Sequence, residues 1–473
     1  MTRQPCPLHK AALHHPHVPA VVTASGRETA FAECDAQAMA AAAALRVQGL
    51  ANGGRIALLN VDNARAIPLL FGAFRAGVTV YLPNMRLPES ALREHVHRAG
   101  CSHAICGEND YASSRRLDPG ALLNHPCDEE LTEVDPRAPA TIVATSGSTG
   151  TPKLVVHALE NHLANAAASN ANIAVEPCDR WLLSLPLYHV SGLEILFRCI
   201  LGGGTVAVPD PGGTLEDALE HLRATHISMV AAQLQRLLDS GCDAKKLSRV
   251  KAVLLGGSAV PETLIERAVA LGVPLHTTYG LTEMASQVTT TPPGAGRHAL
   301  KTSGKPLTPE TLRIAADGEI EVRGPVLFLG YIEEDGTIHR PVTPDGWFRT
   351  KDLGYLDKTG NLCVTGRKDN LFVSGGENIQ PEEIEAVLCA LDAVARAVVV
   401  PVTDPVFGHR PAAFIESAPG FALEPDILAR QLAERLPRYM IPAAWLPWPE
   451  EAAVTGLKPD RSVLRRIAEG KTP

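Results

Sequence analysis

The sequence predicts an α/β protein in which a large N-terminal domain precedes a small C-terminal α+β domain. From residue 30 to about 300, helical segments alternate with short apolar strands, a pattern typical of parallel sheets covered by helices. From 311 to 366, short alternating strands and turns predict an antiparallel, barrel-like part. After Gly366, a helix at 380–391 and a strand at 393–402 predict the small domain. A chain of 473 residues also exceeds what one hydrophobic core usually supports.

Apolar runs and glycines predict the elements in order. The alanine-rich segment 33–50 is expected to form a helix that ends at a glycine. It is followed by an expected strand at 54–61, a helix at 63–77 and a strand at 78–84. The later strands are expected at 227–232, 250–257 and 273–280, and those of the antiparallel part at 318–324, 333–340 and 357–366.

Composition narrows the class of partner. With 45% hydrophobic and 20% charged residues the chain is typical of soluble globular proteins, and its net charge of −8 argues against nucleic acid or an anionic membrane as main partner. The cysteines form no CxxC pair, which predicts reduced thiols in a cytoplasm. No run of apolar residues suits a signal peptide or a membrane span. Metal binding or a frayed, solvated terminus could explain four early histidines, and we favour the second; they are His9, His14, His15 and His17.

A loop of small and hydroxyl residues, Thr145 to Lys153, stands between a predicted buried strand and a predicted helix. Its spacing is not that of a Walker P-loop. Gly147 and Gly150 nevertheless let backbone N–H groups approach an anion, and Lys153 adds a positive charge. A flexible surface loop is the alternative. In the phosphate-binding interpretation, the loop residues expected to contact a nucleotide are Thr145, Ser146, Gly147, Ser148, Thr149 and Gly150.

The loop and four further motifs resemble the adenylate-forming superfamily of acyl-CoA synthetases, adenylation domains and luciferases. These motifs are "TSGSTGTPK" in the loop, "LPLYHVSG" at 185–192, "YGLTE" at 279–283, "WFRTKDLGYLD" at 347–357 and "GRKDNLFVSGGENIQPEEIE" at 366–385. The resemblance covers essentially the whole chain. It implies that a small-molecule carboxylic acid reacts with ATP and Mg²⁺ to give an acyl-adenylate, which coenzyme A then attacks. It also leaves room for a homodimer.

Several site residues can be argued from their chemistry beside the resemblance. The ring of Tyr279 could stack on adenine. Glu283 could bind Mg²⁺, or could be a carboxylate stabilised at a helix N-terminus. Asp352 could accept the ribose hydroxyls, and Arg367 could bind phosphate or ribose, or pair with Asp369. The resemblance implies that the remaining nucleotide and acyl-pocket positions are Gly256, Gly257, Ser258, Thr278, Gly280 and Thr282.

The resemblance also implies a mobile small domain. It assigns Lys458 to the charge that develops at the α-phosphate, although only one residue separates it from Gly456, which departs slightly from the usual motif. Asp369 is the hinge position, and rotation about it would exchange the faces of the small domain. The expected domains are 1–366 and 370–473, with the hinge at 367–369. His189 would gate the acyl pocket or contact the carboxylate, or it could simply cap the following helix.

Within the superfamily the likeness is strongest to the o-succinylbenzoate–CoA ligases of menaquinone synthesis, through segments such as "WLLSLPLYHVSGLEILFR" and "FGHRP". Ser191 and Arg198 share one face of the predicted apolar helix at 191–201. The arginine needs an anion, either Glu194 four residues earlier or a second carboxylate on the substrate, and the likeness favours the substrate. Another aryl- or short-acyl-CoA ligase, an adenylation enzyme that loads a carrier protein, and a non-catalytic relative remain alternatives.

Overall fold

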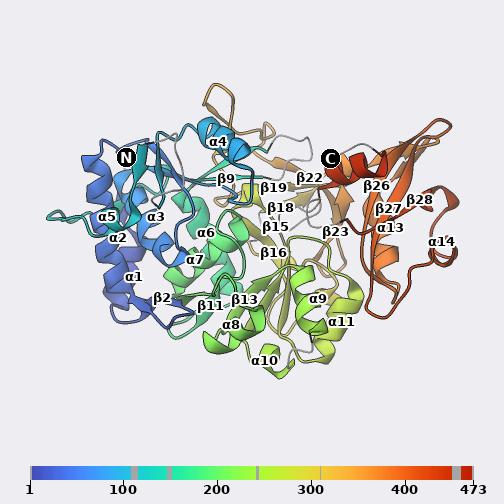
Figure 1. Ribbon diagram of the computed structural model, residues 1–473, viewed down its shortest axis with the longest axis horizontal. Coiled ribbons are helices and arrows are strands. Elements are labelled where there is room, and N and C mark those ends of the chain that lie inside the picture. The colour runs from blue at the N-terminus through green and yellow to red at the C-terminus, as the bar shows by residue number, and fades with distance from the viewer. Residues whose placement is uncertain are drawn as a thin grey trace.

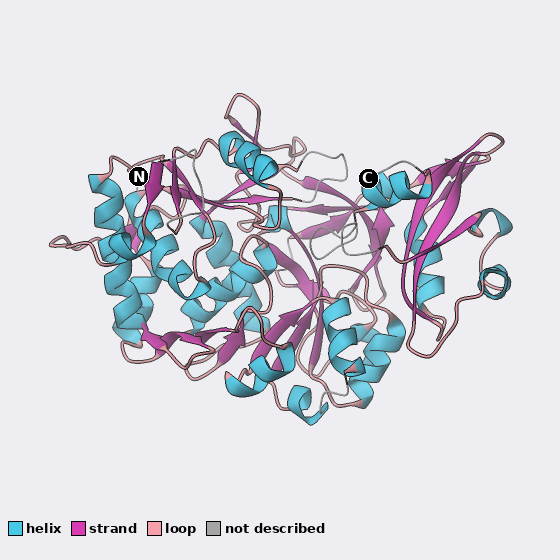
Figure 2. Ribbon diagram, viewed as in Figure 1, coloured by secondary structure: helices cyan, strands magenta, loops and turns pink. Residues whose placement is uncertain are grey.

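The computed structural model describes residues 3–107, 115–145, 152–240, 244–308, 311–449 and 460–470. Two large sheets form the N-terminal domain, and the C-terminal strands and helices lie at the opposite end of the molecule from the first helices (Figure 1). Figure 2 shows the same mixture of helices and strands throughout the large domain. The α/β class predicted from the alternating pattern is therefore confirmed.

The first large sheet has eight strands. Its parallel part follows from the βαβ pattern of the first hundred residues, and antiparallel strands extend it at one edge. In spatial order the strands are β21 (Ile338–His339), β20 (Gly330–Ile332), β10 (Leu154–Ala158), β9 (Pro139–Ala144), β5 (Thr79–Leu82), β4 (Arg55–Leu58), β6 (His103–Ile105) and β7 (Arg115–Leu117).

The second large sheet has nine strands and is likewise parallel in its centre. It brings the first strands of the chain beside strands from its middle. In spatial order they are β17 (Lys305–Pro306), β16 (Ser286–Thr290), β15 (Leu275–Leu281), β14 (Ala252–Leu255), β13 (His226–Met229), β11 (Arg180–Leu182), β12 (Thr205–Val208), β2 (Pro19–Thr23) and β3 (Glu28–Ala30). A small separate pair joins β1 (Gln4–Pro5) to β8 (Glu133–Val134).

Helices cover these sheets, and two of them lie between the sheets. α6 (Leu159–Asn172) contacts β9 and β10 of the first sheet and β16 of the second, and α7 (Val190–Gly202) packs on α6. The other helices of the domain are α1 (Pro7–His14), α2 (Phe31–Val47), α3 (Ala66–Ala76), α4 (Glu89–Arg98), α5 (Pro119–Leu123), α8 (Leu215–His221), α9 (Ala231–Asp239), α10 (Ala244–Ser248), α11 (Glu262–Ala270) and α12 (Arg297–Leu300).

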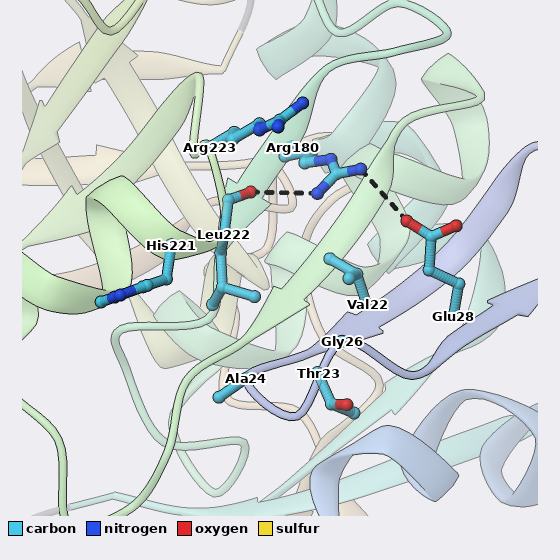
Figure 3. A pocket seen from close by; sticks show the side chains of 9 residues that line it. All are labelled: Val22, Thr23, Ala24, Gly26, Glu28, Arg180, His221, Leu222 and Arg223. Atoms are coloured by element: carbon cyan, nitrogen blue, oxygen red, sulfur yellow. Dashed lines mark hydrogen bonds and ion pairs between the residues drawn. The ribbon is translucent and has the colours of Figure 1, made fainter.

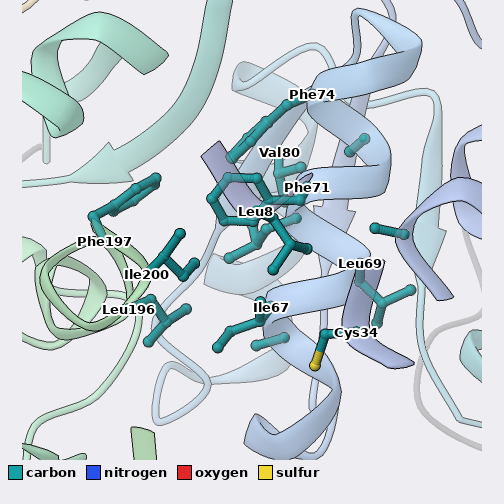
Figure 4. Close-up of a cluster of buried hydrophobic side chains, with 14 of the residues drawn as sticks. Leu8, Cys34, Ile67, Leu69, Phe71, Phe74, Val80, Leu196, Phe197 and Ile200 are labelled. Atoms are coloured by element: carbon teal, nitrogen blue, oxygen red, sulfur yellow. The ribbon is translucent and has the colours of Figure 1, made fainter. Parts of the chain in front are cut away.

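The largest apolar core lies among α1, α2, α3 and α7. Phe71, Phe74 and Phe197 meet there, with ring centroids 5.3 to 6.5 Å apart, as Figure 4 shows. The alanine-rich α2 approaches α3 so closely that a Cβ on Gly72 would lie 2.6 Å from the Cβ of Ala41. Small side chains at this contact therefore let the two helices pack nearly backbone to backbone.

The predicted antiparallel part is a four-stranded sheet of β18 (Leu312–Ile314), β19 (Glu319–Val322), β22 (Phe348–Leu356) and β23 (Leu362–Arg367). Among the described strands, β18 and β23 are its two open edges, so it is not closed into a barrel. The segment 333–340 contributes β21 to the eight-stranded sheet instead. β20 pairs with β10 of that sheet, and β21 pairs with Tyr331 and Ile332 of β20, so β21 becomes the edge strand of the eight-stranded sheet.

A 3₁₀ turn at Lys368–Asn370 follows β23 and falls at the predicted hinge. Asp369 there lies 3.2 Å from the Lys351 amine through Oδ2. The segment beyond the turn comprises β24 (Phe372–Ser374), β25 (Glu377–Ile379), α13 (Pro381–Cys389), β26 (Val394–Asp404), β27 (Gly408–Ser417), α14 (Pro425–Ala433), β28 (Ala444–Pro447) and α15 (Arg461–Ala468). The α+β character predicted after Gly366 is thus confirmed.

The N-terminal segment differs from the sequence-based expectation. The prediction of a frayed, solvated terminus is wrong, because residues 7–14 form α1 and the His9 ring lies 2.8 Å from Asp35 of α2. Among the described residues no group of three metal-ligating side chains occurs, and every described cysteine is a free thiol. In the described ranges no helix combines the length and apolar character that a membrane crossing requires.

Candidate active site

The glycine- and serine-rich loop joins two strands rather than a strand and a helix. β9 and β10 pair in antiparallel register, and the Thr145 amide donates to the Lys153 carbonyl at 2.9 Å. The predicted helix begins only after β10, at Leu159. Ser146, Gly147, Ser148, Thr149 and Gly150 lie outside the described residues, so their contact with nucleotide stays a prediction. The two described ends of the loop nevertheless place Lys153 at the end of the β9–β10 strand pair, directly before β10.

Tyr331 brings the loop lysine and the predicted metal ligand together. The Lys153 amine lies 4.5 Å from the centroid of the Tyr331 ring, and the Tyr331 hydroxyl donates to Glu283 Oε1 at 2.7 Å. Burial raises the pKa of Glu283, which the hydrogen bond from Tyr331 opposes. Glu283 lies in the three-residue 3₁₀ turn Thr282–Met284, which is too short for the helix-dipole explanation. A cation beside this carboxylate would favour its ionised form, so the residues fit a Mg²⁺ ion.

Tyr279, Asp352 and Arg367 form a second polar group close by. The Tyr279 hydroxyl donates to Asp352 Oδ2 at 2.7 Å, and Arg367 Nη1 lies 2.8 Å from Asp352 Oδ1. Burial and the Asp352 charge raise the pKa of Tyr279 well above its usual value, so the phenol stays a donor. Arg367 reaches Asp369 only at 4.0 Å, so its main partner is Asp352 rather than the hinge aspartate. These two contacts therefore hold the Asp352 carboxylate between Tyr279 and Arg367.

Glycines at the neighbouring strand ends allow other parts of the chain to approach closely. A Cβ on Gly280 would lie 1.9 Å from the Ser286 carbonyl oxygen, and one on Gly256 would lie 2.6 Å from Thr278 Cγ2. Gly257 has φ +87°, a left-handed conformation that favours glycine. β14 and β15 run parallel, and these residues follow or lie at their carboxyl ends. Ligands of α/β sheets bind outside such ends, which agrees with the predicted placement of Ser258, Thr278 and Thr282.

The helix α7 carries the residues predicted to face the acid. His189 is the N-cap residue of α7, but its side chain makes no capping hydrogen bond, so capping by the imidazole does not explain it. Its ring lies 4.7 Å from that of Tyr188. Ser191 stands in the first turn of the helix and is partly exposed, whereas Arg198 is fully buried.

The salt bridge between Glu194 and Arg198, the alternative to a substrate carboxylate, does not form. Glu194 Oε1 instead lies 2.5 Å from His162 Nδ1 on α6, and no ion pair joins it to Arg198. Arg198 donates through Nη2 to the Ser286 hydroxyl at 3.3 Å and lies over the Trp181 ring at 5.1 Å. In the described part of the chain, its Nε and Nη1 have no hydrogen-bond partner. The i, i+4 spacing makes Glu194 and Arg198 neighbours on α7, but His162 of α6 is the nearer partner for the Glu194 carboxylate.

Lys458 lies outside the described residues, so its predicted role stays a prediction. Arg461, three positions later, is described and has a structural task. Its Nη1 and Nη2 lie 2.7 and 2.8 Å from the two carboxylate oxygens of Glu385 on α13. Asp460 caps α15 by accepting from the Ser462 amide at 2.8 Å. The segment that follows Lys458 is therefore fastened to the small domain.

Sequence reasoning missed Tyr331, Trp181 and His157. Tyr331 contacts the site from a segment distant in the chain, and the contacts of all three residues depend on which face of a strand meets which helix. The only local signal was the pair His157 and His162 directly after the loop motif, which hinted at a polar cluster. Tyr331 follows Gly330 in an unremarkable apolar stretch, and no spacing links it to Lys153.

A surface hollow of about 320 Å³ lies apart from these residues, beside β2 and β11. There Arg180 donates to the Leu222 carbonyl at 3.3 Å and pairs with Glu28 at 3.2 Å, as Figure 3 shows. None of the predicted site residues lines it. Most of the predicted site residues that the structure describes instead lie on α7, on β15 and the turn after it, on β22 and β23, and directly before β10.

Comparison with known proteins agrees with this geometry. Residues 8–332 match the AMP-binding enzyme family, and residues 383–457 match the AMP-binding enzyme C-terminal domain. The chain therefore belongs to the AMP-binding enzyme family.

The curated relatives specify the family further. A 2-succinylbenzoate–CoA ligase of Geobacillus kaustophilus is 35% identical over 445 residues, with 89% of this chain and 90% of that protein aligned. The 2-succinylbenzoate–CoA ligase of Escherichia coli K12 is 34% identical over 428 residues, with 90% of each chain aligned. A solved o-succinylbenzoate CoA synthetase from Bacillus subtilis, in complex with the acyl-adenylate intermediate OSB-AMP, superposes with a TM-score of 0.86 at 30% identity, covering 98% of this chain and 99% of that one. The same Bacillus enzyme in complex with ATP and magnesium ion gives a TM-score of 0.85 at 29% identity, with 98% and 99% covered.

Proposed function

We propose that the protein is an AMP-forming 2-succinylbenzoate–CoA ligase of menaquinone biosynthesis. In the first step a carboxylate oxygen of the acid bonds to the α-phosphorus of ATP, and pyrophosphate leaves. In the second step the sulfur of coenzyme A bonds to the acyl carbon, and AMP leaves. The family, the two relatives at about 35% identity and the polar groups around Lys153 and Asp352 support this reaction.

The main observation in favour of 2-succinylbenzoate as the substrate is the buried guanidinium of Arg198. It is fully buried, two of its nitrogens lack hydrogen-bond partners among the described residues, and burial lowers its pKa to about 10. A buried cation without a contacting anion is costly, and a planar guanidinium suits a carboxylate. 2-Succinylbenzoate has a second carboxylate that could fill this need, whereas benzoate has none. Because no part of Arg198 is exposed, binding must move side chains that now cover it.

The nucleotide roles are proposed from the described contacts of Lys153, Asp352 and Glu283 and, for Lys458, from the family resemblance. Lys153, and Lys458 when the small domain is suitably placed, would stabilise the negative charge that develops as pyrophosphate leaves. Asp352, held by Tyr279 and Arg367, would accept the ribose hydroxyls. Glu283 would hold Mg²⁺, which when bound offsets the charge of the triphosphate. This reaction needs positioning and charge stabilisation rather than acid–base groups.

The proposal is tested with Arg198→Ala. Pyrophosphate exchange should show the KM for 2-succinylbenzoate raised by about 10- to 100-fold, as loss of a charged hydrogen bond predicts, with little change for benzoate. Arg297→Ala, a change of an exposed arginine, is the control and should leave both acids unaffected. Equal effects of Arg198→Ala on both acids would remove the substrate assignment.

The alternatives have separate tests. Another aryl- or short-acyl-CoA ligase would prefer a different acid in a panel of carboxylates. An enzyme that loads a carrier protein would form the adenylate but would not release AMP when free coenzyme A is added.

Two further expectations belong to the proposal. The free thiols, including the exposed Cys178, support a reducing, cytoplasmic location, which cell fractionation tests. A homodimer is proposed from the family resemblance, and sedimentation equilibrium tests it.

A further inference from the structure

A buried row of hydrogen-bonding side chains crosses the domain from α7 to the Thr282–Met284 turn. Glu194 Oε1 lies 2.5 Å from His162 Nδ1, and His162 Nε2 lies 2.7 Å from Thr141 Oγ1. Thr141 Oγ1 lies 3.5 Å from His157 Nδ1, the longest link, and His157 Nε2 lies 2.7 Å from the Thr282 carbonyl oxygen. All four side chains are fully buried. They come from four elements, α7, α6, β9 and β10, so the row spans the layer between the two sheets.

The end of the row fixes its direction. A carbonyl oxygen only accepts, so His157 Nε2 must carry a proton and donate it to Thr282. In a neutral His157, Nδ1 then accepts from the Thr141 hydroxyl, whose oxygen accepts from His162 Nε2–H. His162 Nδ1 is left as an acceptor, and Glu194, its only partner among the residues that the structure describes, must donate as a neutral carboxylic acid. The opposite direction would leave His157 Nδ1 without a donor and Glu194 as a buried carboxylate.

Burial acts in the same sense on the titratable members. It lowers the pKa of His157 and of His162 to about 3 and raises the pKa of Glu194 well above its usual value, although the positive charge of Arg198 on the same helix opposes the rise at Glu194. Neutral forms of all three are what the directed row requires.

The turn that receives this row is held at three successive carbonyls. The Thr282 oxygen accepts from His157, the Glu283 oxygen from the Phe328 amide at 2.8 Å, and the Met284 oxygen from Asn165 Nδ2 at 3.1 Å. Ala285, which follows, has φ +56°, a left-handed conformation that is costly for alanine. Such a turn keeps its shape only if its surroundings impose it, and Glu283 lies at its centre.

We propose that His157 is a positioning residue, oriented through Thr141 and His162 by a protonated Glu194, that fixes the Thr282–Met284 turn so that Glu283 can serve Mg·ATP. The inference rests on the proposed role of Glu283 in the ligase reaction. It also means that α7, which carries Arg198, and the turn that carries Glu283 share one continuous hydrogen-bonded support. His157 touches neither substrate nor metal and acts only through the turn.

The test interrupts the row of hydrogen bonds at Thr141, which is separated from the Thr282–Met284 turn by His157. Thr141→Val removes the hydroxyl with little change of shape, and we expect about a tenfold rise in the KM for Mg·ATP and in the Mg²⁺ concentration needed for half-maximal rate, with the KM for the acid within about twofold, as for loss of one positioning interaction. Thr141→Ser restores the hydroxyl and should restore wild-type values. The matched control is Thr205→Val, another buried threonine whose hydroxyl donates to a carbonyl, that of Pro19, at 2.7 Å. It should leave all KM values unchanged.

Two measurements keep the outcome unambiguous. Nitrogen-15 NMR of labelled histidines should show His157 protonated at Nε2 in the wild type, with a changed signal in Thr141→Val. Glu194→Gln should keep wild-type kinetics, because the carboxamide can donate where the acid did, whereas Glu194→Ala should behave like Thr141→Val. A normal KM for Mg·ATP in Thr141→Val, or equal losses for every substrate, would overturn the proposal. Failure of the proposed function would look different, since the wild type itself would then show no acid-dependent pyrophosphate exchange.

Discussion

Replacing Tyr279 with phenylalanine tests whether Asp352 is held ready for the nucleotide. The Tyr279 hydroxyl donates to Asp352 Oδ2 at 2.7 Å, and both residues are less than a tenth exposed. A hydrogen bond to a charged group contributes about 1.5–3 kcal/mol. Asp352 keeps Arg367 on its other oxygen at 2.8 Å, so the lower part of that range applies. About 1.4 kcal/mol corresponds to a factor of ten, and we expect the KM for ATP to rise about tenfold in Tyr279→Phe.

The assay is pyrophosphate exchange with the acid at saturation, over a range of ATP concentrations. The rate at saturating ATP should change much less than KM, because the phenol is remote from the bonds that form and break. Tyr355→Phe is the matched control, since Tyr355 lies on the same strand as Asp352 but is 54% exposed. If Tyr279→Phe folds, binds the acid normally and keeps the wild-type KM for ATP within twofold, then Asp352 does not depend on Tyr279 and the reasoning fails.

Four further outcomes are expected. Gly280→Ala should lower the Tm by several degrees and weaken ATP binding, because its Cβ would meet the Ser286 carbonyl at 1.9 Å, whereas Gly212→Ala, with nothing nearer than 3.9 Å, should be neutral in differential scanning calorimetry. Lys153→Met should slow pyrophosphate exchange by about 100-fold, as loss of one charge-stabilising donor predicts, and an unchanged rate would contradict its role. Arg461→Met should destabilise the small domain by about 3–5 kcal/mol, since it leaves the Glu385 carboxylate without its cationic partner and with only the Val399 amide as a donor among the described residues, and limited proteolysis should then release α15 sooner than in Arg466→Met. Acidification should destabilise the fold, because burial lowers the pKa of His157 and of His162 to about 3 in the folded state, whereas both have ordinary pKa values when unfolded. Below pH 6.5 the unfolded state therefore binds more protons than the folded state, and each histidine lowers the free energy of unfolding by about 1.4 kcal/mol per pH unit. The Tm should fall less steeply between pH 6.5 and 5.5 in His157→Gln, and an identical slope would contradict neutral burial.

Local pattern was enough for most of the fold. The alanine-rich segment became α2, ending at Val47 shortly before Gly49, and the predicted strand at 250–257 became β14. These elements depend on side-chain periodicity and on glycine, which act within a few residues. The antiparallel part was harder, because β21 joined the eight-stranded sheet through β20, a pairing that no local pattern encodes.

For the candidate site, the sequence by itself determined which residues are proposed to carry the chemistry, such as Lys153, Glu283 and Asp352, because motif spacing fixes residue type and order along the chain. Only the tertiary structure decided their partners. Glu194 lies one helical turn from Arg198 yet bonds to His162, and Tyr331 links Glu283 to Lys153 from another strand. The physical reason is that a polar side chain in a water-free interior must take whichever partner the packing of distant segments brings within about 3 Å, and that packing depends on the whole chain.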